Sequence, residues 1–150
     1  MQQRIGITGS RKGTTPRQLF RFHIILLNIS KQNIISELHH GDCVGFDEEA
    51  HKLVELNHKN INIHIHPPSY HKHRAFCETD DKFMHKEKPF LIRNKDIVNV
   101  TDILIAGPNS RKGKLRSGTW STIRYALKKD KEIYIIYPDG AWEHKNALKE

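Results

Sequence analysis

Short apolar runs alternate along the 150-residue chain with longer segments of helical periodicity. Isoleucine-rich runs predict five strands, at 4–8, 34–39, 61–66, 102–106 and 132–137. Apolar positions three or four residues apart predict a helix over 16–30, which Thr15 and Pro16 begin, and further helices starting near 46, spanning 90–100 and following 118. Residues 69–89 are polar and are expected to form a long loop. Residues 141–150 are expected to form a short tail, with a helix as one option.

Strands that alternate with helices imply βαβ units and a parallel sheet. We therefore predict one α/β domain over 1–150, with a Rossmann-like, doubly wound, mainly parallel five-stranded sheet and helices on both faces. Ligands of such sheets bind outside the carboxyl ends of the strands. The segments 9–13, 40–47, 107–118 and 137–140 each follow a predicted strand, so we expect them to share one edge of the sheet.

The first of these segments is Gly9-Ser10-Arg11-Lys12-Gly13. Small residues let backbone N–H groups approach an anion, and the start of the following helix adds positive potential. Arg11 can bind two phosphate oxygens at once, and Lys12 adds a point charge. The alternative is a tight strand-to-helix turn that carries a solvated basic pair, and the segment alone does not separate the two.

The second segment, residues 40–47, contains Gly41 and Gly45, which permit a backbone that can surround a ligand. Asp42 or Asp47 can accept hydrogen bonds from ribose hydroxyls. The alternative for Asp47 is a stabilising carboxylate in the first turn of a helix.

The third segment runs from Arg116 to Thr122, where Ser117 and Thr119 hydroxyls accompany the free N–H groups of a helix start. These groups can hold an anion, or Ser117 and Thr119 can simply cap the helix. The cation Arg116 lies beside them.

Composition favours an anionic partner. Lysine and arginine number 25 against 17 aspartates and glutamates, a net charge of +8 with neutral histidine. Two cysteines without CxxC spacing indicate a reducing compartment. Because the apolar runs are short and no signal peptide is visible, we expect a cytoplasmic protein without a membrane partner.

Five motifs in register resemble the SLOG superfamily of Rossmann-like domains, which includes the DprA/Smf, Lonely Guy and YpsA-like proteins. They are Gly9-Ser10-Arg11, residues 41–51, Arg93-Asn94, residues 102–106 and residues 117–122. The resemblance implies a pocket for a nucleotide or nucleotide-derived ligand. With the motifs above, it gives these candidate ligand-binding residues: Gly9, Ser10, Arg11, Gly41, Asp42, Gly45, Asp47, Arg93, Asn94, Pro108, Arg116, Ser117, Gly118, Thr119 and Thr122.

The resemblance implies a binding or sensing module, and the alternative is a nucleotide N-glycosidase. Lonely Guy enzymes carry a catalytic glutamate at the position of Thr122, and a hydroxyl cannot replace a carboxylate base. An enzyme would therefore need Asp47 or Asp139 as its carboxylate. A further alternative is single-stranded DNA binding, as in DprA-like proteins, although aromatic residues make up only 8% of the chain. A homodimer is expected by analogy only, and no cofactor is expected.

The chain has eleven histidines. His64 and His66 alternate on a predicted strand and could share a metal ion with His71 or His73. The lysine-rich setting and the absence of a cysteine at ligand spacing favour surface or rim histidines instead. We therefore expect no metal.

Overall fold

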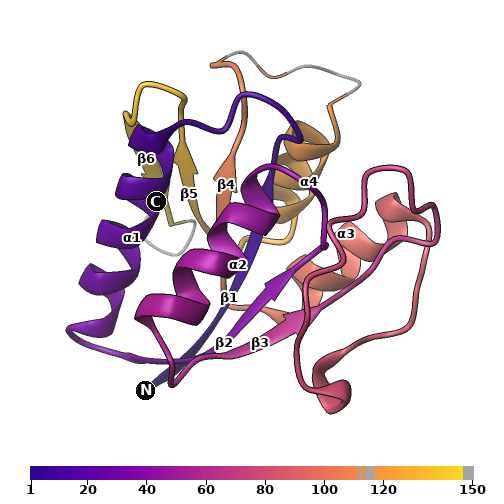
Figure 1. Cartoon of the computed structure of the whole chain (residues 1–150). Helices are drawn as coiled ribbons and strands as arrows, with labels where there is room; N and C mark the ends of the chain where they lie inside the picture. The colour runs from indigo at the N-terminus through magenta and orange to yellow at the C-terminus, as the bar shows by residue number, and fades with distance from the viewer. Residues whose placement is uncertain (112, 114–116, 147–150) are drawn as a thin grey trace.

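The computed structural model describes residues 1–111, 113 and 117–146 as one α/β domain (Figure 1). Its strands and helices follow in chain order: β1 (Gln2–Gly9), α1 (Pro16–Ser30), β2 (Ile34–His40), α2 (Phe46–Asn57), β3 (Asn62–Ile65), α3 (Phe90–Val100), β4 (Ile103–Gly107), α4 (Gly118–Lys128), β5 (Glu132–Ile136) and β6 (Trp142–Lys145). The strands form one sheet in the order β3-β2-β1-β4-β5-β6, parallel except for β6. That is the strand order of the Rossmann fold.

The prediction of five strands was wrong because residues 141–150 include a sixth. β6 pairs antiparallel with β5, and the rings of Tyr134 and His144 stack across the pair at 4.1 Å between centroids. Asp139-Gly140 makes the turn, with Gly140 at φ 86°. The five predicted strands and four predicted helices are confirmed, with ends that shift by one or two residues.

Two helices cover each face of the sheet. In Figure 1, α1 and α2 lie in front of the strands, and α3 and α4 lie behind them. Phe22 of α1 and Phe46 of α2 are fully buried and meet edge to face, with 5.7 Å between ring centroids. On the opposite face, Val98 of α3 and Ile123 of α4 pack against Leu104 of β4. The central strand β4 is therefore apolar on both faces, as βαβ architecture favours.

Local signals explain where α1 begins. Thr15 accepts a hydrogen bond from the Gln18 amide at 3.1 Å, and the Gln18 side chain accepts one from the Thr15 amide at 3.1 Å. This capping box, with Pro16 in the first turn, fixes the entrance of the helix. Buried Gln18 also donates to the carbonyls of Pro108 and Ile136, so α1 is anchored to the ends of β4 and β5.

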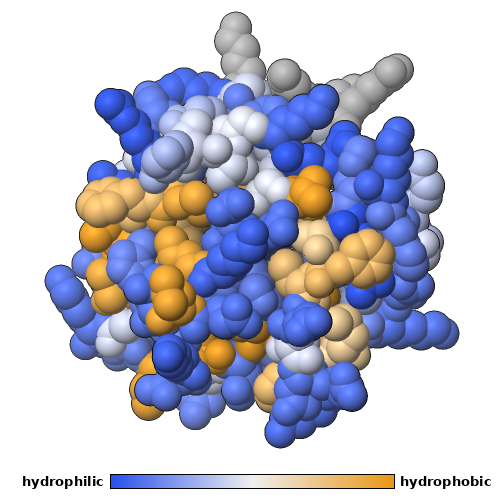
Figure 2. All heavy atoms as spheres, viewed as in Figure 1, coloured by the Kyte–Doolittle hydropathy of each residue, from blue (hydrophilic) through white to orange (hydrophobic). Residues whose placement is uncertain are grey.

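The long 66–89 connection crosses the carboxyl end of β3 and contains a short 3-10 helix, Asp81–Phe83. Bridges join Ile65 to Met84 and Pro68 to Lys88, so part of the connection extends the sheet edge. Figure 2 shows a viewed face that is mostly polar, with apolar side chains gathered on the left over α1 and on the right over the 66–89 connection. Among the helices that the structure describes, none is long and apolar enough to cross a membrane.

Candidate functional site

A cavity of about 600 Å³ opens at the carboxyl ends of β1, β2 and β4, where the strand order reverses. This is the position at which doubly wound sheets bind their ligands. The residues that line the cavity come from the end of β1, four loops and the starts of three helices: Ile7, Thr8, Gly9, Ser10, Arg11, Lys12, Gly41, Cys43, Asp47, Pro68, Tyr70, His73, Phe90, Arg93, Asn94, Asn109, Ser117, Gly118 and Thr119.

The structure brings most of the sequence candidates to this cavity. Those that line it are Gly9, Ser10, Arg11, Gly41, Asp47, Arg93, Asn94, Ser117, Gly118 and Thr119. Residues up to 110 positions apart in the chain, Gly9 and Thr119, therefore line one cavity. Arg116 lies outside the described residues.

Asp47 is the acidic residue of the cavity wall. Its side chain is buried, and its Oδ2 accepts hydrogen bonds from the amides of Gly41 at 3.2 Å and Cys43 at 3.3 Å. Its Oδ1 is also buried and has no hydrogen-bond partner among the described residues. Burial raises the pKa of Asp47 to about 6, although nearby Arg93 and the two amides act in the opposite direction. A buried, unpaired carboxylate oxygen at a cavity wall is costly unless something binds it.

Arg93 holds the wall between α3 and the end of β2. It is buried and donates to the carbonyls of Gly41 and His66, and its Nε donates to Asn94 Oδ1 at 2.7 Å. A Cβ on Gly41 would lie 2.4 Å from the Arg93 guanidinium, so only glycine fits there. The guanidinium thus brings a positive charge to the cavity, while its Nη1 donates to backbone carbonyls and its Nε to the Asn94 side chain.

Asp42, a candidate for ribose binding, is instead a structural anchor. Its carboxylate is fully buried and accepts hydrogen bonds from Arg74 Nε at 2.8 Å and the Cys77 amide at 2.9 Å. Its carbonyl accepts a further bond from the Ala75 amide at 2.7 Å. Since both carboxylate oxygens are occupied, Asp42 ties the 66–89 connection to the end of β2 and is not available to a ligand.

Gly45 and Pro108 are absent from the cavity lining. Gly45, at φ 94°, lets the start of α2 approach the β1–α1 loop, where a Cβ would lie 2.4 Å from the Ser10 carbonyl oxygen. The Phe46 amide donates to that same carbonyl at 3.1 Å. The Pro108 carbonyl accepts from Gln18. Both residues therefore hold the loops together rather than line the site.

Thr122 and Asp139 are also displaced from the cavity. The buried Thr122 hydroxyl donates to the Gly118 carbonyl at 2.8 Å, one turn earlier in α4, so it is not positioned as a phosphate ligand. Asp139 is exposed and accepts from Arg111 at 2.7 Å. Of the two carboxylates proposed for catalysis, only Asp47 faces the cavity.

The start of α4 forms one side of the cavity. Ser117 caps the helix by accepting from the Trp120 amide at 3.2 Å, so its hydroxyl takes the capping role. Gly118 and Thr119 follow in the first turn, where backbone N–H groups lack helical partners. A Cβ built on Gly118 would have no described heavy atom within 4 Å, so the backbone here borders open space.

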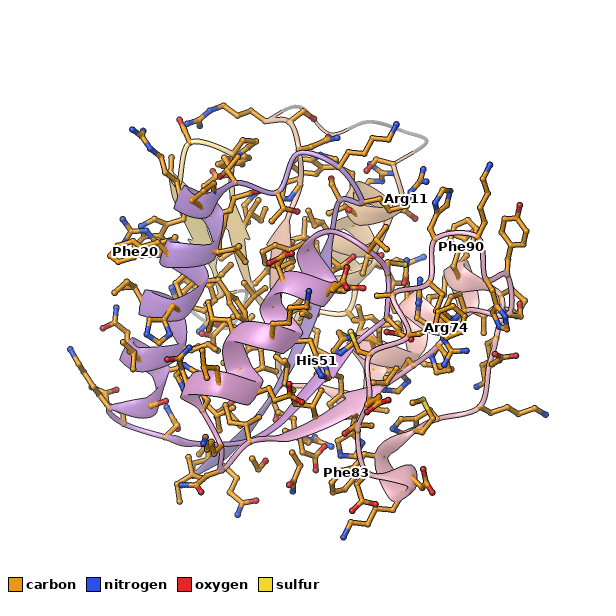
Figure 3. The ribbon with its side chains drawn as sticks, viewed as in Figure 1. Arg11, Phe20, His51, Arg74, Phe83 and Phe90 are labelled. Carbon is orange, nitrogen blue, oxygen red and sulfur yellow. The ribbon has the colours of Figure 1, made fainter. Side chains whose placement is uncertain are left out.

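Cations dominate the charged part of the lining, with Arg11, Lys12 and Arg93 against Asp47. The pKa of His73 is lowered, first by desolvation and then by the charges of Arg11 and Lys72. Figure 3 shows Arg11 and Phe90, from distant parts of the chain, on the same side of the molecule. The site therefore favours an anionic ligand.

Sequence reasoning missed the aromatic residues of the mouth. Tyr70 is 67% exposed and Phe90 is 50% exposed, and both line the cavity. They belong to the 66–89 connection and the start of α3, which periodicity alone does not place at the site. The topology of the chain could have indicated them, because the 66–89 connection leaves the carboxyl end of β3, at the edge of the sheet where the site lies.

No protein-family model matches the chain, and no curated protein matches it. Among solved structures, the chain is similar to the molybdenum cofactor binding protein of the phototrophic bacterium Rippkaea orientalis. The two are 21% identical, with a TM-score of 0.66, over 91% of this chain and 77% of that chain. This likeness supports the Rossmann-like α/β fold, and membership of the SLOG superfamily stays a prediction.

Proposed function

We propose that the protein binds a nucleotide or nucleotide-derived anion in the 600 Å³ cavity, as a binding or sensing module. The observation that carries this proposal is Asp47, which lines the cavity and whose buried Oδ1 has no described hydrogen-bond partner. A ligand hydroxyl or N–H that donates to this oxygen removes the cost of leaving it unpaired. Ribose hydroxyls are donors of this kind.

The remaining walls suit the other parts of a nucleotide. Arg11, Lys12 and the first-turn amides of α4 are donors for phosphate oxygens. The exposed rings of Tyr70 and Phe90 offer apolar surface for a base. The size also fits, since ligand sites commonly span about 300–1,000 Å³.

A thermal-shift screen with AMP, GMP, CMP, UMP, ADP, NAD⁺ and inorganic phosphate tests this proposal. A ligand that binds the folded state raises the melting temperature in a concentration-dependent way. Asp47→Asn and Arg11→Ala should each abolish the shift. Lys59→Ala removes an exposed cation from the turn after α2 and should keep it. The molybdenum cofactor enters the screen because the structural neighbour is described as binding it. Equal shifts for the wild type and Asp47→Asn would contradict the proposal.

The N-glycosidase alternative now rests on Asp47. A carboxyl group with a pKa of about 6 can exchange a proton near neutral pH. Incubation with the nucleoside monophosphates and NAD⁺, followed by chromatography for free base, separates catalysis from binding. Release of base that Asp47→Ala abolishes would replace the binding-only function with an enzymatic one. Binding that strengthens with DNA length and falls steeply with salt would favour single-stranded DNA.

A further inference from the structure

A second group of side chains, away from the cavity, concentrates histidines on one face of the sheet edge. β2 and β3 are parallel neighbours, with His39 in register with His64. Side chains two residues apart on a strand share a face, so Glu37 and His39 join His64 and His66. The intervening residues Leu38, Ile63 and Ile65 belong to the apolar core on the opposite face.

A third extended segment adds another imidazole. The His85 amide donates to the Ile65 carbonyl at 2.9 Å, which places this segment beside β3. The rings of His66 and His85 stack at 3.9 Å between centroids. His39, His66 and His85 each offer a ligand atom, and these atoms lie within 4.8 Å of one another. Three segments far apart in sequence therefore converge on one point.

We propose that His39, His66 and His85 bind a divalent zinc ion. Nitrogen donors of this number and kind suit zinc, with a fourth position left for water or an anion. The Nδ1 of His39 and the Nε2 of His66 are joined by a hydrogen bond of 2.8 Å, so the two atoms are adjacent, and a zinc ion would displace the proton that they share. Coordination requires the His85 ring to tilt out of its stack on His66, which a side chain in an exposed position can do.

Glu37 supplies the supporting contact that metal-bound histidines usually have. Its Oε1 lies 2.7 Å from His39 Nε2, so His39 donates through Nε2 and presents Nδ1 as the lone-pair donor. A carboxylate in this position orients the ring and increases its basicity.

Solvent reaches the cluster through a second cavity of about 330 Å³, lined by His66, His85 and Asp96. Lys88 borders this cavity too, but its ammonium is paired with Asp96 at 2.7 Å. In Figure 3, Phe83, whose ring contacts His64 at 4.5 Å between centroids, lies far from Arg11 at the first cavity. His39, His66 and His85 do not line the first cavity, although Arg93 lines both cavities.

A second described group, His40, His51 and Cys77, is a weaker candidate. His40 Nδ1 accepts from the Asp42 amide at 2.9 Å, so its Nε2 donates to His51 Nδ1 and both His40 nitrogens are used. Burial and the nearby Asp42 raise the pKa of Cys77 to about 12, whereas a metal binds the thiolate. This group therefore serves as the comparison in the test.

The experiment titrates untagged, chelator-treated full-length protein with Zn²⁺ by calorimetry, and with Co²⁺ by visible spectroscopy. We expect one Zn²⁺ per chain and tetrahedral Co²⁺ bands without a sulfur-to-cobalt charge-transfer band. His85→Gln should weaken Zn²⁺ binding by about 100-fold or more, since loss of a supporting contact alone costs about 10–100-fold. His58→Gln is the matched control, because His58 meets His23 at 3.1 Å in a pair that no third ligand joins among the described residues. It should bind like the wild type.

The inference is overturned by absence of Zn²⁺ binding in the folded wild type, or by unchanged affinity in His85→Gln. A sulfur-to-cobalt band that Cys77→Ser removes would place the ion at the other group and overturn it as well. Circular dichroism confirms that each variant is folded. His39→Gln is the second ligand variant and must also lose binding.

Discussion

Asp47→Asn should stabilise the ligand-free protein while it abolishes ligand binding. The pKa of Asp47 is raised from 3.8 to about 6, mainly by burial, so the folded state holds the proton more tightly than the unfolded state does. The contribution of the Asp47 carboxyl to the free energy of unfolding is therefore fully present below pH 3.8 and is lost as the pH rises through about 6. At about 1.4 kcal/mol per pH unit, the loss amounts to about 3 kcal/mol at neutral pH.

An asparagine keeps one oxygen for the Gly41 and Cys43 amides and removes the buried charge. The gain at pH 7.5 should therefore reach up to about 3 kcal/mol and shrink toward pH 4. Urea unfolding of the wild type and of Asp47→Asn from pH 4 to 8 measures the difference in their free energies of unfolding. The titration of all other groups is common to both proteins and cancels in that difference. A variant that is less stable than the wild type at pH 7.5, or a difference that does not change with pH, would refute the reasoning.

Three further substitutions have defined outcomes. Gly118→Ala places a methyl group in open space. Urea unfolding should therefore show a stability equal to that of the wild type or higher by about 0.4–1 kcal/mol, while calorimetry should show nucleotide binding weaker by at least about tenfold. An unchanged affinity would mean that the ligand binds elsewhere. Arg74→Ala leaves the buried Asp42 carboxylate without its cation and should cost about 3–5 kcal/mol in urea unfolding, with part recovered by adding Asp42→Asn. Thr15→Ala removes the capping hydroxyl of α1 and should cost about 1 kcal/mol, and a cost near zero would contradict the role of the capping box.

Local signals predicted the elements well where tertiary packing agrees with them. The helix 90–100 matches the structure because the periodicity of its apolar residues favours it. The start of α1 at Pro16 matches because Thr15 caps that helix. β6 was missed because a four-residue, mostly exposed strand has little pattern of its own and is stabilised by pairing with β5. The Asp139-Gly140 turn was the available signal.

The site was predictable to the extent that topology fixes it. Loops that follow parallel strands meet at one edge, so Ser10, Asp47 and Thr119 could be placed together from sequence. The sequence could not show whether Asp42 or Asp47 faces the cavity, because the partner of Asp42 is Arg74, which lies 32 residues further along the chain. The same holds for the histidines. His64 and His66 were considered as metal ligands together with His71 or His73, but surface or rim histidines were favoured, whereas the structure brings them to His39 and His85.

The central claim is that three backbone turns at the carboxyl ends of β1, β2 and β4 bind one anionic ligand. Amide chemical-shift mapping by NMR during titration with AMP tests it most directly. We predict that the largest shifts cluster on Ser10, Arg11, Gly41, Gly118 and Thr119, with inorganic phosphate moving only the Ser10–Arg11 and Gly118–Thr119 amides. Shifts confined to other surfaces, or none at millimolar AMP, would contradict the claim.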